Sequence, residues 1–256
     1  MILALDIGNT NITIGVYDDK ELLFVSRMAT DSSRMEDQYA IELRDILDIY
    51  GIALKDIEGA VISSVVPPVT TFIVRAIKRL TKVDAICVGK DTKTNIKVNI
   101  RPELVGADLL VGCVAAARMF QGSTIILDMG TATTLMVLDG DRTLLGGSIF
   151  PGVGISMDAL TRRTAQLPSI SLEAPKQAIG NNTIECMRSG IILGTACMID
   201  GMVERMEAEL GQKCHVVATG GLSKEIVRHC KRTIHFCDNL LLEGLRIIYE
   251  DNKQPA

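Results

Sequence analysis

"LALDIGNTNITIGVYDDKELL", residues 3–23, is an apolar strand pattern that runs into Asp6 and a series of small and polar residues. The stretch "ILDMGTATTLMVLDGDRTLL", residues 126–145, repeats the pattern, with Asp128 in the place of Asp6 at an offset of 122. Further along, the two stretches align again after a slip of one residue. A repeat of about half the chain predicts a duplicated domain, and chance similarity of two hairpins is the alternative.

Each copy has the periodicity of an α/β domain. Three short strands are expected at the start of each half, at residues 1–6, 11–17 and 21–28 and again at 123–128, 132–138 and 143–149. Helical patterns follow in both halves, and an amphipathic helix ends the chain. The sequence therefore predicts two copies of one domain, residues 1–120 and 121–256, that face each other across a cleft.

The composition excludes several classes of protein. The 256 residues carry a net charge of −4, so the basic footprint of a nucleic-acid-binding protein is absent. No apolar run reaches the roughly 18 residues of a membrane span. The start of the chain lacks the pattern of a secretory signal. The seven cysteines show no CxxC spacing, which fits reduced thiols in the cytoplasm, and no His/Cys cluster has the spacing of a zinc site.

The turn after the first strand has the residues of a phosphate site. A glycine there lets the backbone approach a ligand closely, and the N–H groups and side chains of Asn9, Thr10 and Asn11 can donate to phosphate oxygens. The Asp6 carboxylate suits Mg²⁺. We therefore expect a metal-and-phosphate corner in each half, although a simple hairpin turn is the alternative for either one alone. No GxxxxGK[ST] is present, so a P-loop is excluded.

Two further stretches could complete a phosphoryl-transfer site. Thr219-Gly220-Gly221 ends a predicted strand and opens a helix, a place for the ribose or a phosphate of a nucleotide. Asp108 follows Gly106-Ala107 and precedes a strongly apolar helix, so it could accept the proton of an acceptor hydroxyl. Its alternative role is to cap that helix.

Short motifs in a fixed order cover nearly the whole chain: Asp6-Ile7-Gly8-Asn9-Thr10, Ser63-Ser64-Val65-Val66-Pro67, Gly106-Ala107-Asp108, Asp128-Met129-Gly130-Thr131-Ala132-Thr133-Thr134, Gly146-Gly147-Ser148-Ile149 with Pro151-Gly152, Thr164-Ala165-Gln166-Leu167-Pro168, Gly180-Asn181-Asn182-Thr183 and Thr219-Gly220-Gly221-Leu222. Together they resemble the type III pantothenate kinases, within the superfamily of actin, sugar kinases and heat-shock-protein ATPases. The resemblance implies two ribonuclease-H-like (actin-like ATPase) domains, each a mixed sheet flanked by helices, with the active site in the cleft between them.

The resemblance also implies an activity and its components. The protein would be a cytoplasmic homodimer that phosphorylates pantothenate with ATP, which is the first step of coenzyme A synthesis. Its cofactors would be Mg²⁺ and a monovalent cation such as K⁺ or NH4⁺. No nucleic acid or membrane partner is implied.

Roles for single residues follow from the same resemblance. It implies that the first phosphate and metal corner consists of Asp6, Ile7, Gly8, Asn9, Thr10, Asn11, Ile12 and Thr13. It implies that Thr131 binds ATP, that Asp128 holds the monovalent cation and that Asp108 is the catalytic base. Gly106 and Ala107 would line the pantothenate pocket, and Thr183 would reach pantothenate from the neighbouring subunit.

Three positions depart from the family pattern. Leu109 stands where the family usually has Arg, Asn99 stands where members often carry Tyr, and Met136 stands where many carry Asp. The first two family positions belong to the pantothenate pocket, and Arg101 is a possible replacement for the missing positive charge. An enzyme with another acceptor, or a binding protein that has lost catalysis, is therefore the alternative to a pantothenate kinase.

Overall fold

The computed structural model describes residues 1–101 and 105–253, and residues 102–104, at the start of the loop expected before Gly106, lie outside this description. The chain forms two compact units. The first contains Met1–Ile96, Ile100–Ala115 and the C-terminal residues from Asn239, and the second contains Lys97–Asn99 and Ala116–Asp238. The C-terminal helix thus belongs to the first unit. The domain limits 1–120 and 121–256 stay a prediction.

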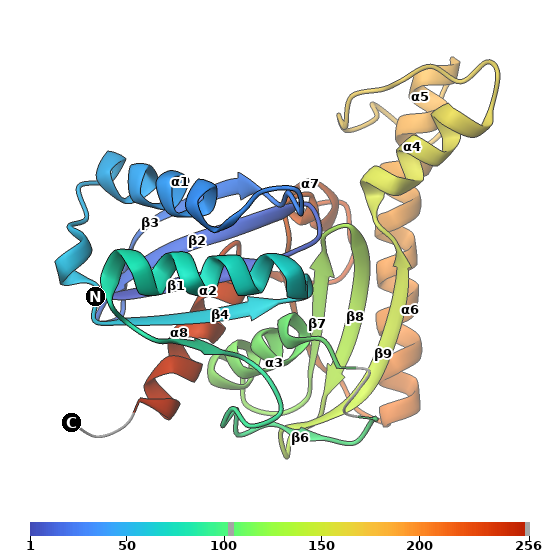
Figure 1. Ribbon diagram of the computed structural model, residues 1–256. Helices are drawn as coiled ribbons and strands as arrows, with labels where there is room; N and C mark the ends of the chain where they lie inside the picture. The colour runs from blue at the N-terminus through green and yellow to red at the C-terminus, as the bar shows by residue number, and fades with distance from the viewer. Residues whose placement is uncertain (102–104, 254–256) are drawn as a thin grey trace. The chain divides into compact units, whose positions relative to one another are not determined.

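The sheet of the first unit has five strands in the order β3-β2-β1-β4-β5 (Figure 1). They are β1 (Ile2–Ile7), β2 (Asn11–Asp18), β3 (Glu21–Ala29), β4 (Gly59–Ser64) and β5 (Ala85–Cys87). β1, β2 and β3 form an antiparallel meander, whereas β4 and β5 run parallel to β1. The first three strands lie within one residue of their predicted limits. Every residue of β1 has partners on both sides, which fixes the strand in the centre of the sheet.

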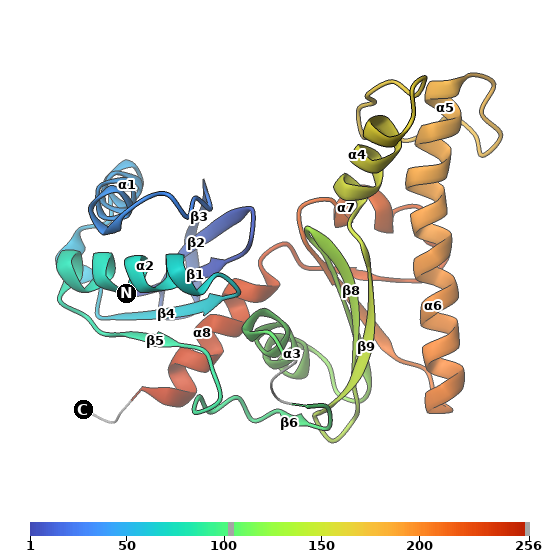
Figure 2. The same ribbon diagram turned by 45° about the vertical axis from the view of Figure 1, so that its right-hand side comes forward.

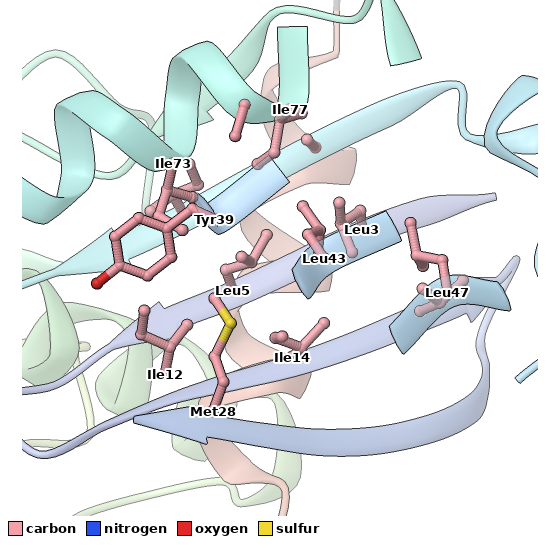
Figure 3. Packing of buried hydrophobic residues seen from close by; sticks show 14 of the residues in the cluster. Leu3, Leu5, Ile12, Ile14, Met28, Tyr39, Leu43, Leu47, Ile73 and Ile77 are labelled. Carbon is pink, nitrogen blue, oxygen red and sulfur yellow. The ribbon is translucent and has the colours of Figure 1, made fainter. Parts of the chain in front are cut away.

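One face of this sheet is covered by α1 (Glu36–Ile49) and α2 (Pro67–Thr81). In α1 the residues Tyr39, Leu43 and Leu47 are four positions apart, so they form one apolar stripe, and all three are fully buried. Figure 3 shows this stripe against the strand side chains of the cluster, among them Leu3, Leu5, Ile12 and Ile14. Each fully buried Leu or Ile side chain contributes about 1.5–3 kcal/mol to folding, so this layer anchors β1 and β2. The prolines at positions 67 and 68 occupy the first turn of α2, where their missing N–H groups are tolerated.

The opposite face of the first sheet is covered by α8 (Leu240–Asn252) and by the beginning of α3 (Ala107–Met119). Figure 2 shows α8 on the side of the strands away from α1 and α2. The buried cluster on this face is formed by Ala4, Tyr17, Val61, Val88, Val111, Val114, Leu242, Leu245, Ile247 and Ile248. The expected amphipathic helix at the end of the chain is confirmed. Its partner is the sheet of the N-terminal half, a contact that local periodicity does not predict.

The sheet of the second unit has six strands in the order β11-β10-β7-β8-β9-β6. They are β6 (Lys97–Val98), β7 (Thr124–Met129), β8 (Ala132–Leu138), β9 (Thr143–Pro151), β10 (His215–Thr219) and β11 (His235–Phe236). β7, β8 and β9 form an antiparallel meander, and β10 and β11 run parallel to β7. β6 is an extra strand at the edge.

The helices of the second unit are α4 (Val153–Arg163), α5 (Thr183–Arg188), a π-helical turn η3 (Ser189–Leu193), α6 (Gly194–Leu210) and α7 (Ser223–Val227). α5, η3 and α6 join into one helix, Thr183–Leu210, which Figure 1 shows in orange. Ile191, Ile192, Ala196, Ile199 and Val203 form its buried side. Within the described part of the chain this is the one helix long and apolar enough to span a bilayer. That is a weak sign, because helices that pack in a protein core meet the same criterion.

The two units also resemble each other in two local details, a register shift in the meander and a closed turn after its first strand. The register of the β2–β3 pair shifts between Val16 and Tyr17, and that of β8–β9 shifts at the aligned position, between Val137 and Leu138. The turn after β1 closes with the Gly8 N–H on the Asn11 carbonyl, whereas the turn after β7 closes one residue earlier, with the Gly130 N–H on the Ala132 carbonyl. This shorter turn explains the one-residue slip in the sequence repeat. The predicted fold class, two duplicated α/β domains with mixed sheets flanked by helices, is confirmed.

Candidate functional site

Asp6 lies near the carboxyl end of the central strand β1. Its register partners are Thr13 on β2 and Ser63 on β4. Residues directly opposite each other in a sheet point to the same face, so the carboxylate stands between two hydroxyl side chains. This is the face covered by α3 and α8, since Ala4, two residues before Asp6, belongs to that cluster.

The turn between β1 and β2 presents its polar side chains to solvent. Asn9, Thr10 and Asn11 are exposed, which suits the predicted phosphate contacts. Ile7 and Ile12 are fully buried. Their side chains therefore belong to the core, and only their backbone could contact a ligand.

Thr30 holds this turn in shape, a contribution that the sequence did not predict. Its hydroxyl donates to the Gly8 carbonyl at 2.6 Å, and its N–H donates to the Thr10 carbonyl at 3.0 Å. Thr30 directly follows β3, two strands away from β1. No local sequence signal marks this contact, because it depends on the pairing of three strands.

Asp108 lies in the first turn of α3, and Gly106 precedes the helix. The Leu109 N–H donates to Asp108 Oδ1 at 2.8 Å. A Cβ on Gly106 would overlap Asp108 Oδ1, and it would lie 3.7 Å from Val65 Cγ1 in the turn that follows β4. Asp108 is three residues before Val111, so both lie on the helix face that packs against the sheet. The carboxylate of Asp108 is thus held on the same sheet face as Asp6 and Ser63.

Burial raises the pKa of the Asp108 carboxyl, and the hydrogen bond from the Leu109 N–H opposes that rise. A carboxylate with a raised pKa is a better proton acceptor than an exposed one. Since α3 begins at Ala107, Gly106 holds the cap position, and Asp108 is inside the helix. The environment of Asp108 therefore suits a general base.

Asp128 has the equivalent place in the second unit. It lies on β7, and its register partners are Thr134 on β8 and Thr219 on β10. The turn that follows it packs tightly against the end of β9, because a Cβ on Gly152 would overlap the carbonyl oxygens of Gly130 and Thr131. Thr131 itself is exposed. A second carboxylate between two hydroxyls is therefore present, as the repeat predicts.

Gly220 brings the turn after β10 onto the turn after β7. Its φ is +98°, in the region that favours glycine, and a Cβ there would overlap the backbone of Met129. The next residue, Gly221, is exposed. The predicted strand, glycine turn and helix are all present, but α7 has only five residues. Within the second unit, Gly220 therefore lies beside the corner that contains Asp128.

Thr183 begins α5 and is exposed. The Asn182 side chain caps this helix by accepting the Glu185 N–H at 3.0 Å. One turn later, Arg188 pairs with Glu173 at 2.8 Å and donates to Ser171 Oγ at 2.8 Å, which ties the preceding loop to the helix. The Thr183 hydroxyl is thus presented at the end of a long helix. It belongs to the second unit, whereas Asp108 belongs to the first.

The two departures in the predicted acceptor pocket lie in different units. Leu109 is half-buried in the first turn of α3. Asn99 is exposed and follows β6, where its N–H donates to the Leu144 carbonyl at 3.0 Å. The third departure, Met136, is buried in β8. Its role is packing, as expected for a residue in a hairpin strand.

The donors at the two corners fit hard cations. Within residues 1–101 and 105–253, no three His, Cys, Asp or Glu side chains gather as a metal cluster. Mg²⁺ does not require one, because it keeps several waters and takes one or two carboxylates together with the substrate phosphates. At both corners a buried hydroxyl, Ser63 Oγ or Thr134 Oγ1, stands beside the carboxylate and has no hydrogen-bond partner in the described part of the chain. Asp6 and Asp128 are therefore chemically suitable positions for a divalent and a monovalent cation.

Comparison with known sequences gives a consistent family. The profile of "Type III pantothenate kinase" matches residues 2–205. A protein of that name from Roseiflexus sp. is 43% identical over 99% of this chain and 100% of its own length. Another from Exiguobacterium sp. is 41% identical, again over 99% of this chain and its own full length.

Comparison with solved structures supports the fold alone, because the identities are low. A putative Baf family transcriptional activator from Campylobacter jejuni has a TM-score of 0.62 and 18% identity, with 98% of each chain covered. A putative 2-dehydro-3-deoxygalactonokinase from Sinorhizobium meliloti has a TM-score of 0.59 and 14% identity, covering 100% of this chain and 98% of its own. The fold is thus shared with a sugar kinase.

Proposed function

The chain belongs to the type III pantothenate kinase family, and on that premise we propose that it transfers the γ-phosphoryl group of ATP to the primary hydroxyl of pantothenate, with Asp108 as the base. The observation that carries this assignment is the environment of Asp108. Its carboxylate is packed against Gly106, is held by the Leu109 N–H, and has a raised pKa. A base in this position contributes about 10²–10⁴-fold to the rate.

The reaction then depends mainly on positioning. Asp108 accepts the proton of the pantothenate hydroxyl as its oxygen attacks the γ-phosphorus in line, and the β–γ bridging oxygen leaves with ADP. The transition state of such transfers is loose, so orientation and charge stabilisation supply most of the acceleration. The family name implies that ATP is the donor and 4'-phosphopantothenate is the product, an intermediate of coenzyme A synthesis.

We assign the phosphates of ATP to the turn that contains Gly8, Asn9, Thr10 and Asn11, with Asp6 holding Mg²⁺ directly or through its waters. When bound, Mg²⁺ neutralises charge on the phosphate oxygens. In the second unit we assign Thr131, Gly220 and Gly221 to the nucleotide and Asp128 to a monovalent cation, K⁺ or NH4⁺. Two observations support these roles: the turn residues are exposed, and each of the two carboxylates lies between hydroxyl side chains on the neighbouring strands.

For pantothenate we propose a pocket of Gly106, Ala107, Asp108 and Leu109, completed by Thr183 of the partner in a homodimer. Thr183 is exposed at the end of the helix Thr183–Leu210. In the first half of that helix the exposed positions include the small residues Gly190, Gly194 and Cys197, and added Cβ atoms at Gly190 and Gly194 would meet nothing within 4 Å. Ile184 is 43% exposed beside them. An open face of small residues next to an exposed apolar side chain suits the close approach of a second copy.

We also propose a cytoplasmic location, which the thiols of Cys113, Cys214 and Cys230, buried or partly buried outside any disulfide, support. The alternative suggested by Leu109 and Asn99, a relative with another acceptor or without catalysis, is not favoured. Full-length relatives with more than 40% identity carry the kinase name. Leu109 is therefore interpreted as a variation within the pocket of a working enzyme.

The test is ADP release by the purified protein with ATP, Mg²⁺ and K⁺, with and without pantothenate, for the wild type and for Asp108→Asn. We expect turnover that requires pantothenate and falls by about 10²–10⁴-fold in the variant. Turnover that ignores pantothenate, in a folded protein that binds ATP, would mean another acceptor. Full activity of Asp108→Asn would remove Asp108 as the base.

A further inference from the structure

The side chain of Ser63 is fully buried, with 0% of its surface exposed, and its hydroxyl has no hydrogen-bond partner among the residues that the structure describes. A buried polar group without a partner is costly, and native structures contain few of them. Ser63 is followed by Ser64, whose hydroxyl accepts the Val66 N–H at 3.0 Å and the Thr70 hydroxyl at 2.6 Å. Ser64 thus makes the side-chain hydrogen bonds that hold the chain at the end of β4. Ser63 has no structural role of this kind.

The position of Ser63 indicates what its hydroxyl is for. Ser63 is the direct register partner of Asp6, and both side chains are on the sheet face that α3 covers. Val65, two residues later, is the residue that a Cβ on Gly106 would approach. The hydroxyl is therefore beside the proposed metal-holding carboxylate, on the side of the sheet where the proposed base is held.

The second unit gives an internal comparison. Thr219 on β10 is the register partner of Asp128, as Ser63 on β4 is of Asp6. The Thr219 hydroxyl donates to the Asp238 carbonyl at 3.3 Å, so it is satisfied within the protein. Ser63 occupies the equivalent position without such an acceptor. The difference points to a partner that Ser63 gains only when the site is loaded.

We propose that Ser63 is a positioning residue for Asp6: when the metal–nucleotide complex is bound, the Ser63 hydroxyl donates to one carboxylate oxygen of Asp6 and holds the other toward the metal. This inference rests on the metal corner of the proposed function. A hydroxyl can donate to an ionised carboxylate at about 2.5–2.7 Å, and such bonds are roughly twice as strong as neutral ones. The Ser63 hydroxyl thus gains a charged acceptor when the site is loaded.

The experiment measures metal binding directly, apart from catalysis. Mn²⁺ replaces Mg²⁺, the nucleotide is a non-hydrolysable ATP analogue, and free Mn²⁺ is followed by electron paramagnetic resonance. The variants are Ser63→Ala and Ser63→Cys, which remove the strong donor, and Asp6→Asn, which tests the corner itself. Thr133→Val is the matched control, because Thr133 is 1% exposed and equally without a partner, and it is the register partner of Met129, one position past Asp128.

Both Ser63 variants should bind Mn²⁺ roughly 10- to 150-fold more weakly than the wild type, the range for losing a hydrogen bond to a charged group. Asp6→Asn should bind it more weakly still, and Thr133→Val should bind it normally. In steady-state assays, the apparent KM for Mg²⁺·ATP should rise in Ser63→Ala while the KM for pantothenate stays unchanged. The melting temperature of Ser63→Ala should equal or exceed that of the wild type, because an unsatisfied buried group has been removed.

Three outcomes would overturn the inference. Normal Mn²⁺ binding by both Ser63 variants, with weak binding by Asp6→Asn, would refute the role of Ser63 and keep the metal corner. Normal binding by Asp6→Asn would refute the corner and the inference with it. A lower melting temperature in both Ser63 variants, with the KM values for Mg²⁺·ATP and pantothenate raised together, would make the hydroxyl structural.

Discussion

Gly106 and the carboxylate of Asp108 lie so close that a methyl group on Gly106 would overlap Asp108 Oδ1. The same carboxylate oxygen accepts the Leu109 N–H at 2.8 Å. The glycine therefore leaves the space in which the side chain of the proposed base turns back against the start of α3. Because the overlap would be with the carboxylate itself, any larger residue at position 106 must displace the base.

Gly106→Ala should lower kcat by about 100-fold, the loss typical of a catalytic group misplaced by about 1 Å, with little change in melting temperature. The matched control is Gly89→Ala, since a Cβ at Gly89 would meet only the Cys87 carbonyl at 4.0 Å. Steady-state kinetics and thermal unfolding of both variants check this prediction. Equal activity of Gly106→Ala and the wild type would show that the position of Asp108 is not decisive.

Asp108→Asn should stabilise the protein at neutral pH while it removes activity. The folded-state pKa of Asp108 is raised by burial, so the protonated form is favoured by folding. The contribution of this protonated form to stability is complete below the ordinary aspartate pKa of 3.8 and is lost as the pH rises through the folded-state pKa. The stabilisation by Asn should therefore be largest at neutral pH and vanish near pH 4. Urea unfolding of both proteins from pH 4 to 8 measures this difference, and a pH-independent difference would contradict it.

Glu207 should be important for the stability of the second unit. It is 4% exposed on α6, its Oε1 accepts the Cys214 N–H at 2.8 Å, and it pairs with Arg232 and Lys213. Burial alone would raise its pKa, but these hydrogen bonds outweigh burial and lower it. Glu207→Ala leaves the Arg232 guanidinium without its carboxylate partner, so we expect a loss of about 3 kcal/mol in the free energy of unfolding.

The pH dependence gives a second measure of the same interaction. Because the folded-state pKa of Glu207 lies below the ordinary glutamate pKa of 4.5, its stabilisation is present above that pH and is lost as the pH falls through the folded-state pKa. Glu204→Ala is the control, since Glu204 is exposed on the same helix. Equal stability of the Glu204 and Glu207 variants in denaturant unfolding would refute this prediction.

Much of the fold was predictable because its signals are local or repeated. The strand limits around Asp6 and Asp128 follow from short apolar runs that end in turns, and the offset of 122 makes the second copy evident. α8 was recognised as an amphipathic helix, but its place on the first sheet was not. That contact joins the end of the chain to its beginning, and periodicity contains no information about such partners.

The carboxylates of the site were predictable from the sequence, but the hydroxyl residues that support them were not. Asp6, Asp108 and Asp128 stand out because carboxylates in apolar surroundings need a reason. Thr30 does not stand out in the sequence, and Ser63 does so only as part of a motif that gives it no role, since hydroxyl residues at strand ends are common. Their significance depends on the hydrogen bond to Gly8 in one case and on the missing partner in the other. Both facts depend on the pairing of non-adjacent segments, which only the three-dimensional structure supplies.

Arg101 should select for the negative charge of pantothenate. Leu109 cannot pair with a carboxylate, and Arg101 is an exposed cation seven residues before Asp108. Arg101→Ala should raise the KM for pantothenate by about 10- to 150-fold, the value of one charge-assisted contact, and leave the KM for ATP unchanged. The KM for a neutral amide analogue of pantothenate should not change in the variant. Lys97→Ala, which removes another exposed cation of the same segment, is the control. An equal rise for the acid and the amide would mean that Arg101 acts on the fold of the loop instead.

Mixed dimers should show whether Thr183 acts across the subunit interface. Asp108→Asn and Thr183→Ala are each expected to be inactive as pure dimers. If Thr183 serves the active site of its partner, a mixed dimer has one site with Asp108 from one chain and Thr183 from the other. Random mixing should then restore roughly a quarter of the wild-type activity, since half of the dimers are mixed and each has one complete site. The double variant mixed with wild type is the control: every site in its mixed dimers lacks one of the two groups, so its activity should come only from the roughly one quarter of dimers that are pure wild type. No recovery from the two single variants, with subunit exchange verified by mass spectrometry, would place Thr183 in the site of its own chain.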